Sequence, residues 1–383
     1  IVDHVMLLLI LLVVLGCVAY IGIGRWIERR VAHTRSGEQR RALFPPEVGI
    51  SPGAKDLASS SDVELKKELY RIRDGSQIFF HILKPKNKPI THALVFLHGY
   101  SSTGDLYLEF LAELARSGIM VLIPDLPGHG RSDGLLLYIP DWWVFVDQVW
   151  TALELVLPME CIVGGQMLQL FLAGNSLGGG LAACLALQRP GFFKGVLLLC
   201  PMLTVSEEVK PPWIVQMIFK YLLARLSLAL WDYLTTPTLK FPTWPVTPSK
   251  DISDFDFREP AQGNKYVKMN PLSLQGLTPR LGTSLQLAFV YPDWLKERMS
   301  EVRTPFMIQH GLEDRVTDPN TSKQLYKEAI AKDKTLKLYD GVYHCEMFCC
   351  LPGNEKMLGL KWSPEQVAVT KTCLEDMKTW MSE

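Results

Sequence analysis

Gly174-Asn175-Ser176-Leu177-Gly178 is the stretch of sequence that decides the fold. It matches Gly-x-Ser-x-Gly, follows the apolar run 168–173 and precedes the small-residue run 179–187, which predict a buried strand and a helix. A serine between two glycines at a strand-to-helix turn is typical of a nucleophile elbow, where the tight turn leaves no room for neighbouring side chains. We therefore predict that Ser176 is a catalytic nucleophile rather than a structural turn residue.

A nucleophilic serine needs a base and an acid that orients the base, and in this architecture the chain order is serine, acid, histidine. Of the eight histidines, only His344 lies C-terminal to a plausible acid loop, and it follows a short strand expected at 336–339. The acid should lie in the loop after the preceding strand. Asp318 precedes a proline there, which is typical of a helix N-cap. Asp314 and Glu313 remain, and we favour Asp314.

An oxyanion hole should complete the site. One donor is expected at the backbone N–H of Leu177, at a helix N-terminus where the helix dipole favours negative charge. The second is expected in the loop after the apolar strand 93–97, where the N–H of Tyr100 follows Gly99. His98 in the same loop is expected to hold it by hydrogen bonds rather than to perform chemistry.

Five motifs together resemble one known family. They are His98-Gly99-Tyr100, the run 124–134, Gly174 to Gly179, His310-Gly311 through Asp314 to Pro319, and Tyr343-His344. They are similar to those of monoacylglycerol lipase-like serine hydrolases of the serine aminopeptidase S33 group, especially the plant monoglyceride lipase and caffeoylshikimate esterase branch.

The resemblance covers about Leu65 to Met381 and implies an α/β-hydrolase fold. It also implies the catalytic triad Ser176, Asp314 and His344, with Tyr100 and Leu177 lining the oxyanion hole. The chain departs from the family pattern at Leu177, where Met is common, and at 345–350. These departures leave the identity of the substrate open.

Residues 5–24 form an apolar run without one charge. About 20 helical residues span ~30 Å, the thickness of the bilayer hydrocarbon. A cleaved signal peptide would have a shorter apolar region preceded by positive charge, and a lipoprotein signal at Leu15-Gly16-Cys17 would not continue as apolar sequence. Arginines follow the run, from Arg25 to Arg41. They favour a single-pass membrane anchor with the catalytic domain on the cytoplasmic side. The chain begins with Ile1 rather than Met, so we expect upstream residues whose charges also count toward the orientation.

Composition argues against several other classes. Lys+Arg 40 balance Asp+Glu 40, so no basic field indicates a nucleic-acid partner. The eight cysteines form no Cys-x-x-Cys pair and are interpreted as reduced, which suits a cytosolic catalytic domain. No metal and no cofactor is expected, because the histidines have hydrolase roles and no ligand spacing occurs.

The chain is predicted to divide into a membrane anchor at 5–24, a polar linker at 25–62 and an α/β-hydrolase domain at 63–383. The domain should begin with a hairpin around Asp74-Gly75 and continue as a mostly parallel sheet with helices on both faces. An apolar and aromatic insertion at about 201–303 is expected to form a helical cap over an acyl tunnel. Candidate substrate-binding wall residues of the tunnel are Trp213, Met217, Phe219 and Trp231.

These features predict a membrane-anchored serine hydrolase that cleaves carboxylic esters of lipids, monoacylglycerol or lysophospholipid, to free fatty acid. Its partners would be the lipid ester substrate and the bilayer. A phenolic-ester (caffeoylshikimate-type) esterase or an acyltransferase is the alternative among enzymes, because any alcohol can intercept an acyl-enzyme. A ligand receptor on a hydrolase fold, with an intact triad and negligible turnover, is the alternative from another class.

Overall fold

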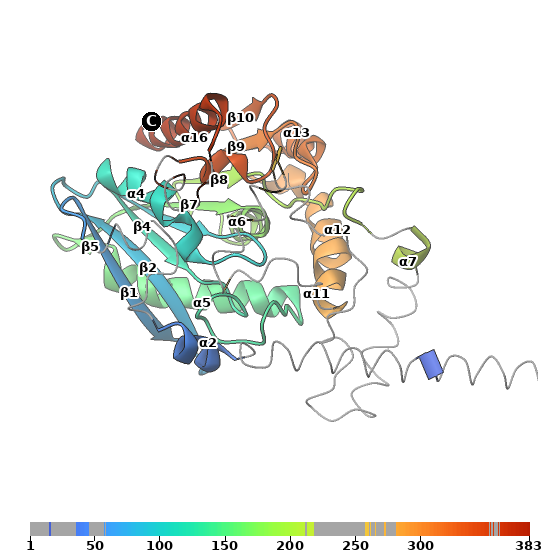
Figure 1. Ribbon diagram of the computed structural model, residues 1–383, viewed down its shortest axis with the longest axis horizontal. Helices are drawn as coiled ribbons and strands as arrows, with labels where there is room; N and C mark the ends of the chain where they lie inside the picture. Colours follow the sequence, from blue (N-terminus) through green and yellow to red (C-terminus); the bar gives the residue numbers. More distant parts are fainter. Residues whose placement is uncertain are drawn as a thin grey trace, which may run out of the picture.

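The computed structural model describes residues 36–45, 59–210, 213–217, 281–351 and 361–383, with a few isolated residues between them. Within these ranges an eight-stranded sheet runs through the molecule in the order β1-β2-β4-β3-β7-β8-β9-β10 (Figure 1). Its strands are β1 (Val63–Arg71), β2 (Gln77–Pro85), β3 (His92–Leu97), β4 (Ile119–Pro124), β7 (Gln169–Asn175), β8 (Gly195–Leu199), β9 (Phe306–Gly311) and β10 (Lys334–Tyr339).

The sheet is mostly parallel, as the sequence predicts. β1 pairs with β2, and β2 with β4, in antiparallel fashion, whereas each of the other neighbouring pairs is parallel. The hairpin expected around Asp74-Gly75 is confirmed, with register from Val63–Pro85 to Arg71–Gln77. Gly75 at its turn has φ 87°, a conformation that favours glycine. The parallel strands place their carboxyl ends along one edge of the sheet.

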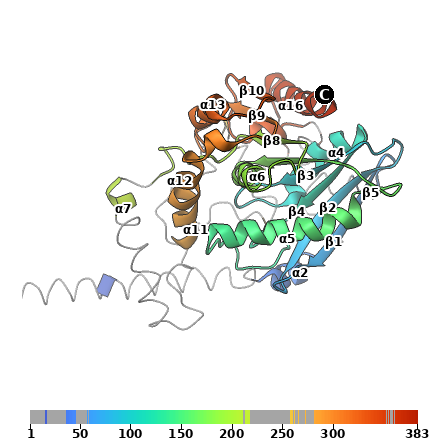
Figure 2. The same ribbon diagram turned by 180° about the vertical axis from the view of Figure 1, so that it is seen from behind.

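Helices cover both faces of the sheet (Figures 1 and 2). The main ones are α4 (Leu108–Arg116), α5 (Trp142–Glu160), α6 (Leu177–Gln188), α13 (Pro319–Glu328) and α16 (Pro364–Ser382). Alternate side chains of β3 point to opposite faces. Ala93 and Val95 belong to a core cluster shared with α5 and α6, whereas Leu94 and Phe96 belong to one shared with α4 and α16. This alternation explains why β3 is apolar throughout and buried between two helical layers.

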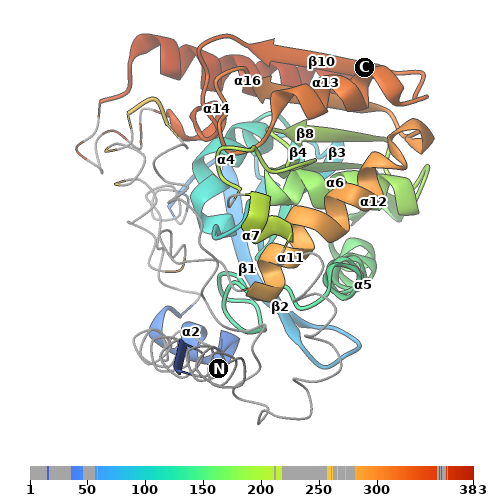
Figure 3. The same cartoon turned by 90° about the vertical axis from the view of Figure 1, so that its right-hand side faces the viewer.

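Shorter elements connect these layers. They are η2 (Gly104–Tyr107), the two-stranded hairpin β5 (Ile162–Val163) and β6 (Gln166–Met167), α7 (Trp213–Met217), α11 (Leu281–Leu285), the π-helical turn η6 (Gln286–Val290), α12 (Tyr291–Lys296), η7 (Met299–Glu301) and α14 (Glu346–Cys349). The three consecutive elements α11, η6 and α12 run along one side of the domain, near α6 and the start of α5 (Figure 3). They form the returning part of the insertion between β8 and β9.

Part of the segment predicted as a polar linker, 25–62, is a helix in the structure. Residues Gly37–Leu43 form helix α2, which lies against the domain beside β2 (Figure 1). A capping box starts the helix: the Gln39 N–H donates to Ser36 Oγ at 3.0 Å, and the Ser36 N–H donates to Gln39 Oε1 at 3.3 Å. Arg40 is completely buried by this docking. The polar segment 37–43 is thus part of the folded domain, because Arg40 is buried in it.

Two other predicted regions fall largely outside the described residues. The anchor at 5–24 is described only at Leu15 and Gly16, and residues 218–256 of the predicted cap are not described. In the part of the chain that the structure covers, no helix combines the length and apolar character needed to cross a bilayer.

Candidate active site

Ser176 occupies a strained turn between β7 and α6. Its φ of 52° and ψ of −117° lie in a region that L-residues rarely adopt. The flanking glycines permit this turn, because a Cβ at Gly178 would collide with the carbonyl of Leu97 and a Cβ at Gly174 with that of Gly178. The Ser176 N–H donates to the carbonyl oxygen of Leu199, at the end of β8, at 3.0 Å. The geometry matches the predicted elbow.

The structure brings Asp314 and His344 together and leaves Glu313 apart. Asp314 follows β9, His344 follows β10, and His344 Nδ1 lies 2.6 Å from Asp314 Oδ2. Glu313 is exposed. A carboxylate only accepts, so Nδ1 carries the proton and donates it. The other ring nitrogen, Nε2, is then the acceptor, as a general base for a serine hydroxyl requires.

Four further contacts hold the Asp314 carboxylate. Oδ1 accepts from the N–H groups of Val316 at 2.8 Å and Thr317 at 2.9 Å. Oδ2 lies 3.1 Å from His310 Nε2 and 2.9 Å from the Thr317 hydroxyl. Burial raises the pKa of this carboxyl, but the adjacent His344 and His310 outweigh burial and hold the pKa well below its usual range. Asp314 is therefore a fixed negative charge beneath the imidazole of His344.

Ser176, Asp314 and His344 follow β7, β9 and β10, so all three leave the same edge of the sheet. β8 lies between β7 and β9, and the loops that follow these two strands both form hydrogen bonds to the end of β8. Its end accepts the Ser176 N–H at Leu199, and the next carbonyl, that of Cys200, accepts the Thr317 hydroxyl at 3.1 Å. The serine turn and the acid loop are thus fastened to consecutive peptide units.

One group among the described residues has potential metal ligands close together. The ligand atoms of Cys200, Asp314 and His344 lie within 4.8 Å of one another. Two of the three already form the hydrogen-bonded pair. Burial raises the pKa of the Cys200 thiol well above its ordinary value, so the free thiol keeps its proton. The arrangement fits acid–base chemistry better than metal binding.

The predicted oxyanion donors belong to two segments next to Ser176. Leu177 is buried at the first position of α6, where the N–H groups of a helix have no partner within the helix. Tyr100 lies in the loop after β3, and its hydroxyl donates to the carbonyl of Leu137 at 3.0 Å. A Cβ on Gly99 would lie 3.4 Å from Ser176 Cβ, so this loop passes directly beside the serine.

His98 holds the loop after β3 by hydrogen bonds, as predicted; we name this loop, residues 98–104, the oxyanion loop after its predicted role. Its Nε2 accepts from the Leu126 N–H at 2.9 Å, and its Nδ1 donates to the Gly99 carbonyl at 2.8 Å. Burial lowers the pKa of His98 to about 4, so the ring is neutral near pH 7, in the tautomer that this pair of bonds requires. Its role here is to fix two backbone segments, one at Gly99 and one at Leu126.

Two residues outside the predicted site, Tyr107 and Asn175, join the oxyanion loop to the elbow. The Gly99 N–H donates to the Tyr107 hydroxyl at 3.3 Å, and this hydroxyl donates to Asn175 Oδ1 at 2.9 Å. Asn175 in turn donates to the carbonyl of Leu199 at 3.2 Å. Asn175 stands within the Gly-x-Ser-x-Gly motif and could have been found there. Tyr107 has no motif around it and becomes visible only in the fold.

The four candidate tunnel residues are not brought together among the described residues. Trp213 and Met217 lie on α7 with exposed fractions of 70% and 47%. Phe219 and Trp231 lie outside the described residues. The acyl tunnel and its four wall residues therefore stay a prediction.

The returning part of the insertion is attached beside the oxyanion loop. The Thr283 hydroxyl donates to the Leu137 carbonyl at 3.1 Å and accepts from the Ile139 N–H at 2.8 Å. The rings of Trp142 and Tyr291 lie 4.4 Å apart between centroids. Because Tyr100 donates to the same Leu137 carbonyl, the insertion and the oxyanion loop share one anchoring point.

This combination of a mostly parallel sheet, a strained serine and an Asp–His pair defines a serine hydrolase of the α/β-hydrolase fold. Residues 88–348 match the family model described as serine aminopeptidase, S33. The chain belongs to that family, and it is a carboxylic ester hydrolase related to monoglyceride lipases.

Named relatives and solved structures agree with this placement. Human monoglyceride lipase is 30% identical, with 71% of this chain and 80% of the lipase covered. Caffeoylshikimate esterase from Arabidopsis thaliana is 27% identical, with 86% and 89% covered. The crystal structure of a soluble variant of monoglyceride lipase from Saccharomyces cerevisiae, in complex with a substrate analog, has a TM-score of 0.62 at 18% identity. It covers 85% of this chain and 96% of that one. At that identity the likeness shows the fold.

Proposed function

We propose that this protein hydrolyses single-chain lipid esters, monoacylglycerol or lysophospholipid, with Ser176, His344 and Asp314 as its catalytic triad. Ser176 Oγ attacks the ester carbonyl while His344 Nε2 takes the hydroxyl proton. The tetrahedral oxyanion accepts hydrogen bonds from the N–H groups of Leu177 and Tyr100. His344 then gives the proton to the leaving alcohol, and water releases the fatty acid from the acyl-enzyme.

The buried hydrogen bond between Asp314 and His344, on the sheet edge that also carries the strained Ser176, is the observation that carries the proposal. Two oxyanion donors would supply a large part of the barrier lowering, since the loss of one donor typically costs ~3–4 kcal/mol. The lipid substrate class is supported by the likeness to the human monoglyceride lipase and by the apolar run at 5–24.

A substrate panel on purified protein tests the substrate class. Each methylene buried on acyl binding contributes ~0.8 kcal/mol, so kcat/KM should rise nearly fourfold per carbon until the acyl site is filled. Monoacylglycerols should be cleaved faster than triacylglycerols, because a site for one chain leaves two surplus chains in water. Faster cleavage of acetate or caffeoyl esters than of monoacylglycerols across the panel would overturn the lipid proposal and leave the hydrolase mechanism standing.

A phenolic ester is the second candidate substrate. The likeness to caffeoylshikimate esterase extends over more of the chain than the likeness to the human lipase, which favours keeping this class in the panel. A receptor role is tested by the same assay. Turnover of a short p-nitrophenyl ester by the wild-type protein would exclude a ligand receptor that binds without hydrolysis.

We also propose that residues 5–24 anchor the protein in a membrane as a single span, with the domain on the cytoplasmic side. The uncharged length of the run and the arginines after it support this topology. The full chain should resist extraction from membranes by carbonate, whereas a chain lacking 5–24 should be released and stay active on dispersed esters. A deleted chain that remains membrane-bound would show that another surface carries the attachment.

A further inference from the structure

Helix α2 is fastened to the loop between β4 and α5 by a buried arginine. Arg40 is completely buried, and its guanidinium donates to the carbonyls of Gly130 at 2.6 Å, Ser132 at 2.5 Å and Gly134 at 3.3 Å. Burial lowers the pKa of Arg40 to about 10, so its charge persists at neutral pH. One side chain therefore fixes three peptide units of this loop, residues 125–134, which we name the support loop.

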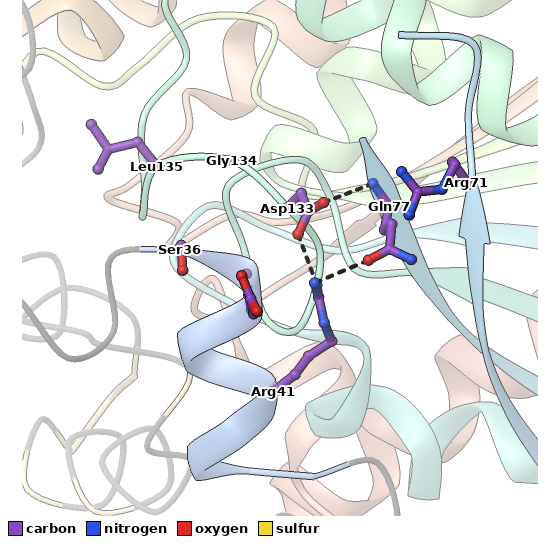
Figure 4. Close-up of a pocket in the computed structure, with 9 residues that line it drawn as sticks. Ser36, Arg41, Arg71, Gln77, Asp133, Gly134 and Leu135 are labelled. Carbon is purple, nitrogen blue, oxygen red and sulfur yellow. Dashed lines mark hydrogen bonds and ion pairs between the residues drawn. The ribbon is translucent and has the colours of Figure 1, made fainter. Parts of the chain in front are cut away.

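The fit between α2 and the support loop is close on both sides of Arg40. A Cβ on Gly37 would lie 2.6 Å from the Ser132 carbonyl oxygen, so only glycine allows this approach. Arg41 donates to Asp133 Oδ1 at 2.9 Å and to Gln77 Oε1 at 3.2 Å. Figure 4 shows these bonds at the wall of a cavity of about 810 Å³ beside α2. Close packing at Gly37 and the polar contacts of Arg40 and Arg41 therefore both hold the helix in place.

The support loop in turn holds the oxyanion loop at both of its ends. At the start, the Leu126 N–H donates to His98 Nε2 at 2.9 Å. At the end, Asp125 Oδ1 accepts from the Gly104 N–H at 2.8 Å, while its Oδ2 accepts from the Arg131 N–H at 2.8 Å. Burial raises the pKa of Asp125, but the neighbouring His81 and Arg131 outweigh burial and hold the pKa of this carboxyl well below its usual range.

A second connection leads directly from α2 to the same place. Arg131 Nε donates to the Phe44 carbonyl, at the end of α2, at 2.9 Å, and Arg131 also binds Asp105 Oδ2 at 2.6 Å. Asp105 follows Gly104 in η2. Both charged groups are fully buried, so their geometry depends on every partner being in place. Contacts thus run without a gap from α2 to the backbone that carries Tyr100.

We propose that α2 is a positioning element of the oxyanion hole, and that Arg40 is its positioning residue. Docking of Arg40 sets the support loop, and the support loop sets the oxyanion loop 98–104 at the distance from Ser176 that transition-state binding requires. The inference rests on the proposed oxyanion hole. It also joins the catalytic machinery to the segment that follows the proposed anchor, so the position of α2 would govern turnover.

The test uses the full chain and p-nitrophenyl butyrate, an ester that does not depend on the lipid proposal. Arg40→Met should lower kcat about tenfold, less than the 10²–10³ for outright loss of a donor, because the donor is displaced rather than removed. KM should change little, since the oxyanion exists only in the transition state. The Ki of an alkyl trifluoromethyl ketone, which forms a tetrahedral adduct on the serine, should rise by the same factor as kcat falls.

Arg71→Met is the matched control. Arg71 lines the same cavity and is exposed, so the same substitution there should leave kcat and the ketone Ki at wild-type values. Arg40→Lys, which keeps the charge and some donors, should fall between wild type and Arg40→Met. All rates are normalised to sites titrated with a fluorophosphonate, so loss of folded protein does not enter the comparison.

Gly37→Ala provides an independent disturbance if Arg40→Met fails to fold. It leaves Arg40 in place but lifts α2 away from Ser132, and it should raise the ketone Ki as well. Wild-type kcat and Ki in folded Arg40 and Gly37 variants would overturn the proposal. So would a fall in thermal stability with an unchanged Ki, which would make α2 merely structural. Failure of the wild type to cleave monoacylglycerols would overturn the substrate proposal alone, because these ratios are measured on another ester.

Discussion

The two sides of the candidate active site are held by contacts of different reach. On the acid side, Asp314 binds His310, Val316 and Thr317, all within four positions of it in the chain. On the oxyanion side, His98 is bound by a residue 28 positions away, and Tyr107 by one 68 positions away. Arg40, which acts on the oxyanion loop through the support loop, binds a carbonyl 90 positions away in the chain.

This difference has a physical consequence. A short loop that folds on itself brings its own donors, and Asp314 keeps several of them when one is removed. The oxyanion loop depends more on distant segments. Besides local bonds such as that of Gly99 to Tyr107, its two ends are each placed by one bond from the support loop, which must itself be docked. We therefore expect equivalent deletions of one hydrogen bond to cost more activity on the oxyanion side.

Ser176 lies where the two sides meet, so its replacement should have the largest effect. Ser176→Ala should lower kcat by roughly 10⁶ and leave weak residual hydrolysis from the oxyanion hole. His344→Ala should be about as damaging, because serine and base act as a unit. Loss of fluorophosphonate labelling checks the assignment, and normal labelling of Ser176→Ala would refute it.

Asp314→Asn should have the next largest effect, a fall in kcat of ~10⁴, because an amide no longer holds the imidazole in the tautomer that leaves Nε2 free. The neighbouring Glu313→Gln is the control, since this side chain is exposed and should stay near wild type. Steady-state rates on one short ester decide between them. A crippled Glu313→Gln would mean that the acid is wrongly assigned and that the acid side of the comparison fails.

Tyr107→Phe tests the oxyanion side by removing one hydroxyl. Burial raises the pKa of Tyr107 well above its ordinary value, so this hydroxyl keeps its proton and joins Gly99 to Asn175. Loss of one buried hydrogen bond costs about 1–1.5 kcal/mol, which corresponds to roughly tenfold in kcat if the oxyanion geometry absorbs it. Tyr326→Phe, the same change on α13, should be silent. Equal rates for the two variants would remove Tyr107 from the positioning network.

The same contrast of reach explains what the sequence could predict. The elbow, the order of the triad and the preference for Asp314 over Asp318 depend on motifs of a few residues, and the structure places Asp314 against His344 as those motifs suggest. The β1–β2 hairpin likewise follows from Asp74-Gly75 and its flanking alternation.

The supports of the oxyanion loop could not be predicted in this way. Tyr107 and Arg131 act through residues far away in the chain, and no spacing in the sequence links them. Helix α2 did carry a local signal, the capping pair of Ser36 and Gln39, but its polar surroundings favoured a linker. What made α2 part of the domain was the burial of Arg40 against three carbonyl groups, which only the tertiary structure supplies.

Thr317→Val should have the smallest effect and sharpens the comparison most. The Thr317 hydroxyl has one proton, shared between Asp314 Oδ2 at 2.9 Å and the Cys200 carbonyl at 3.1 Å, so Asp314 receives it only part of the time. Valine has nearly the same shape and keeps the Thr317 backbone N–H that donates to Oδ1. The backbone N–H of Val316 and the rings of His310 and His344 also remain in contact with Asp314. We therefore expect kcat to fall by less than about threefold, a smaller loss than the ~1.5–3 kcal/mol typical of a full hydrogen bond to a charged group.

The measurement is the ratio of kcat for Thr317→Val to kcat for Tyr107→Phe on the same ester, with both proteins titrated for active sites. A ratio below one would mean that the acid side, despite its many donors, is the less tolerant of the two, and the redundancy argument would then be wrong.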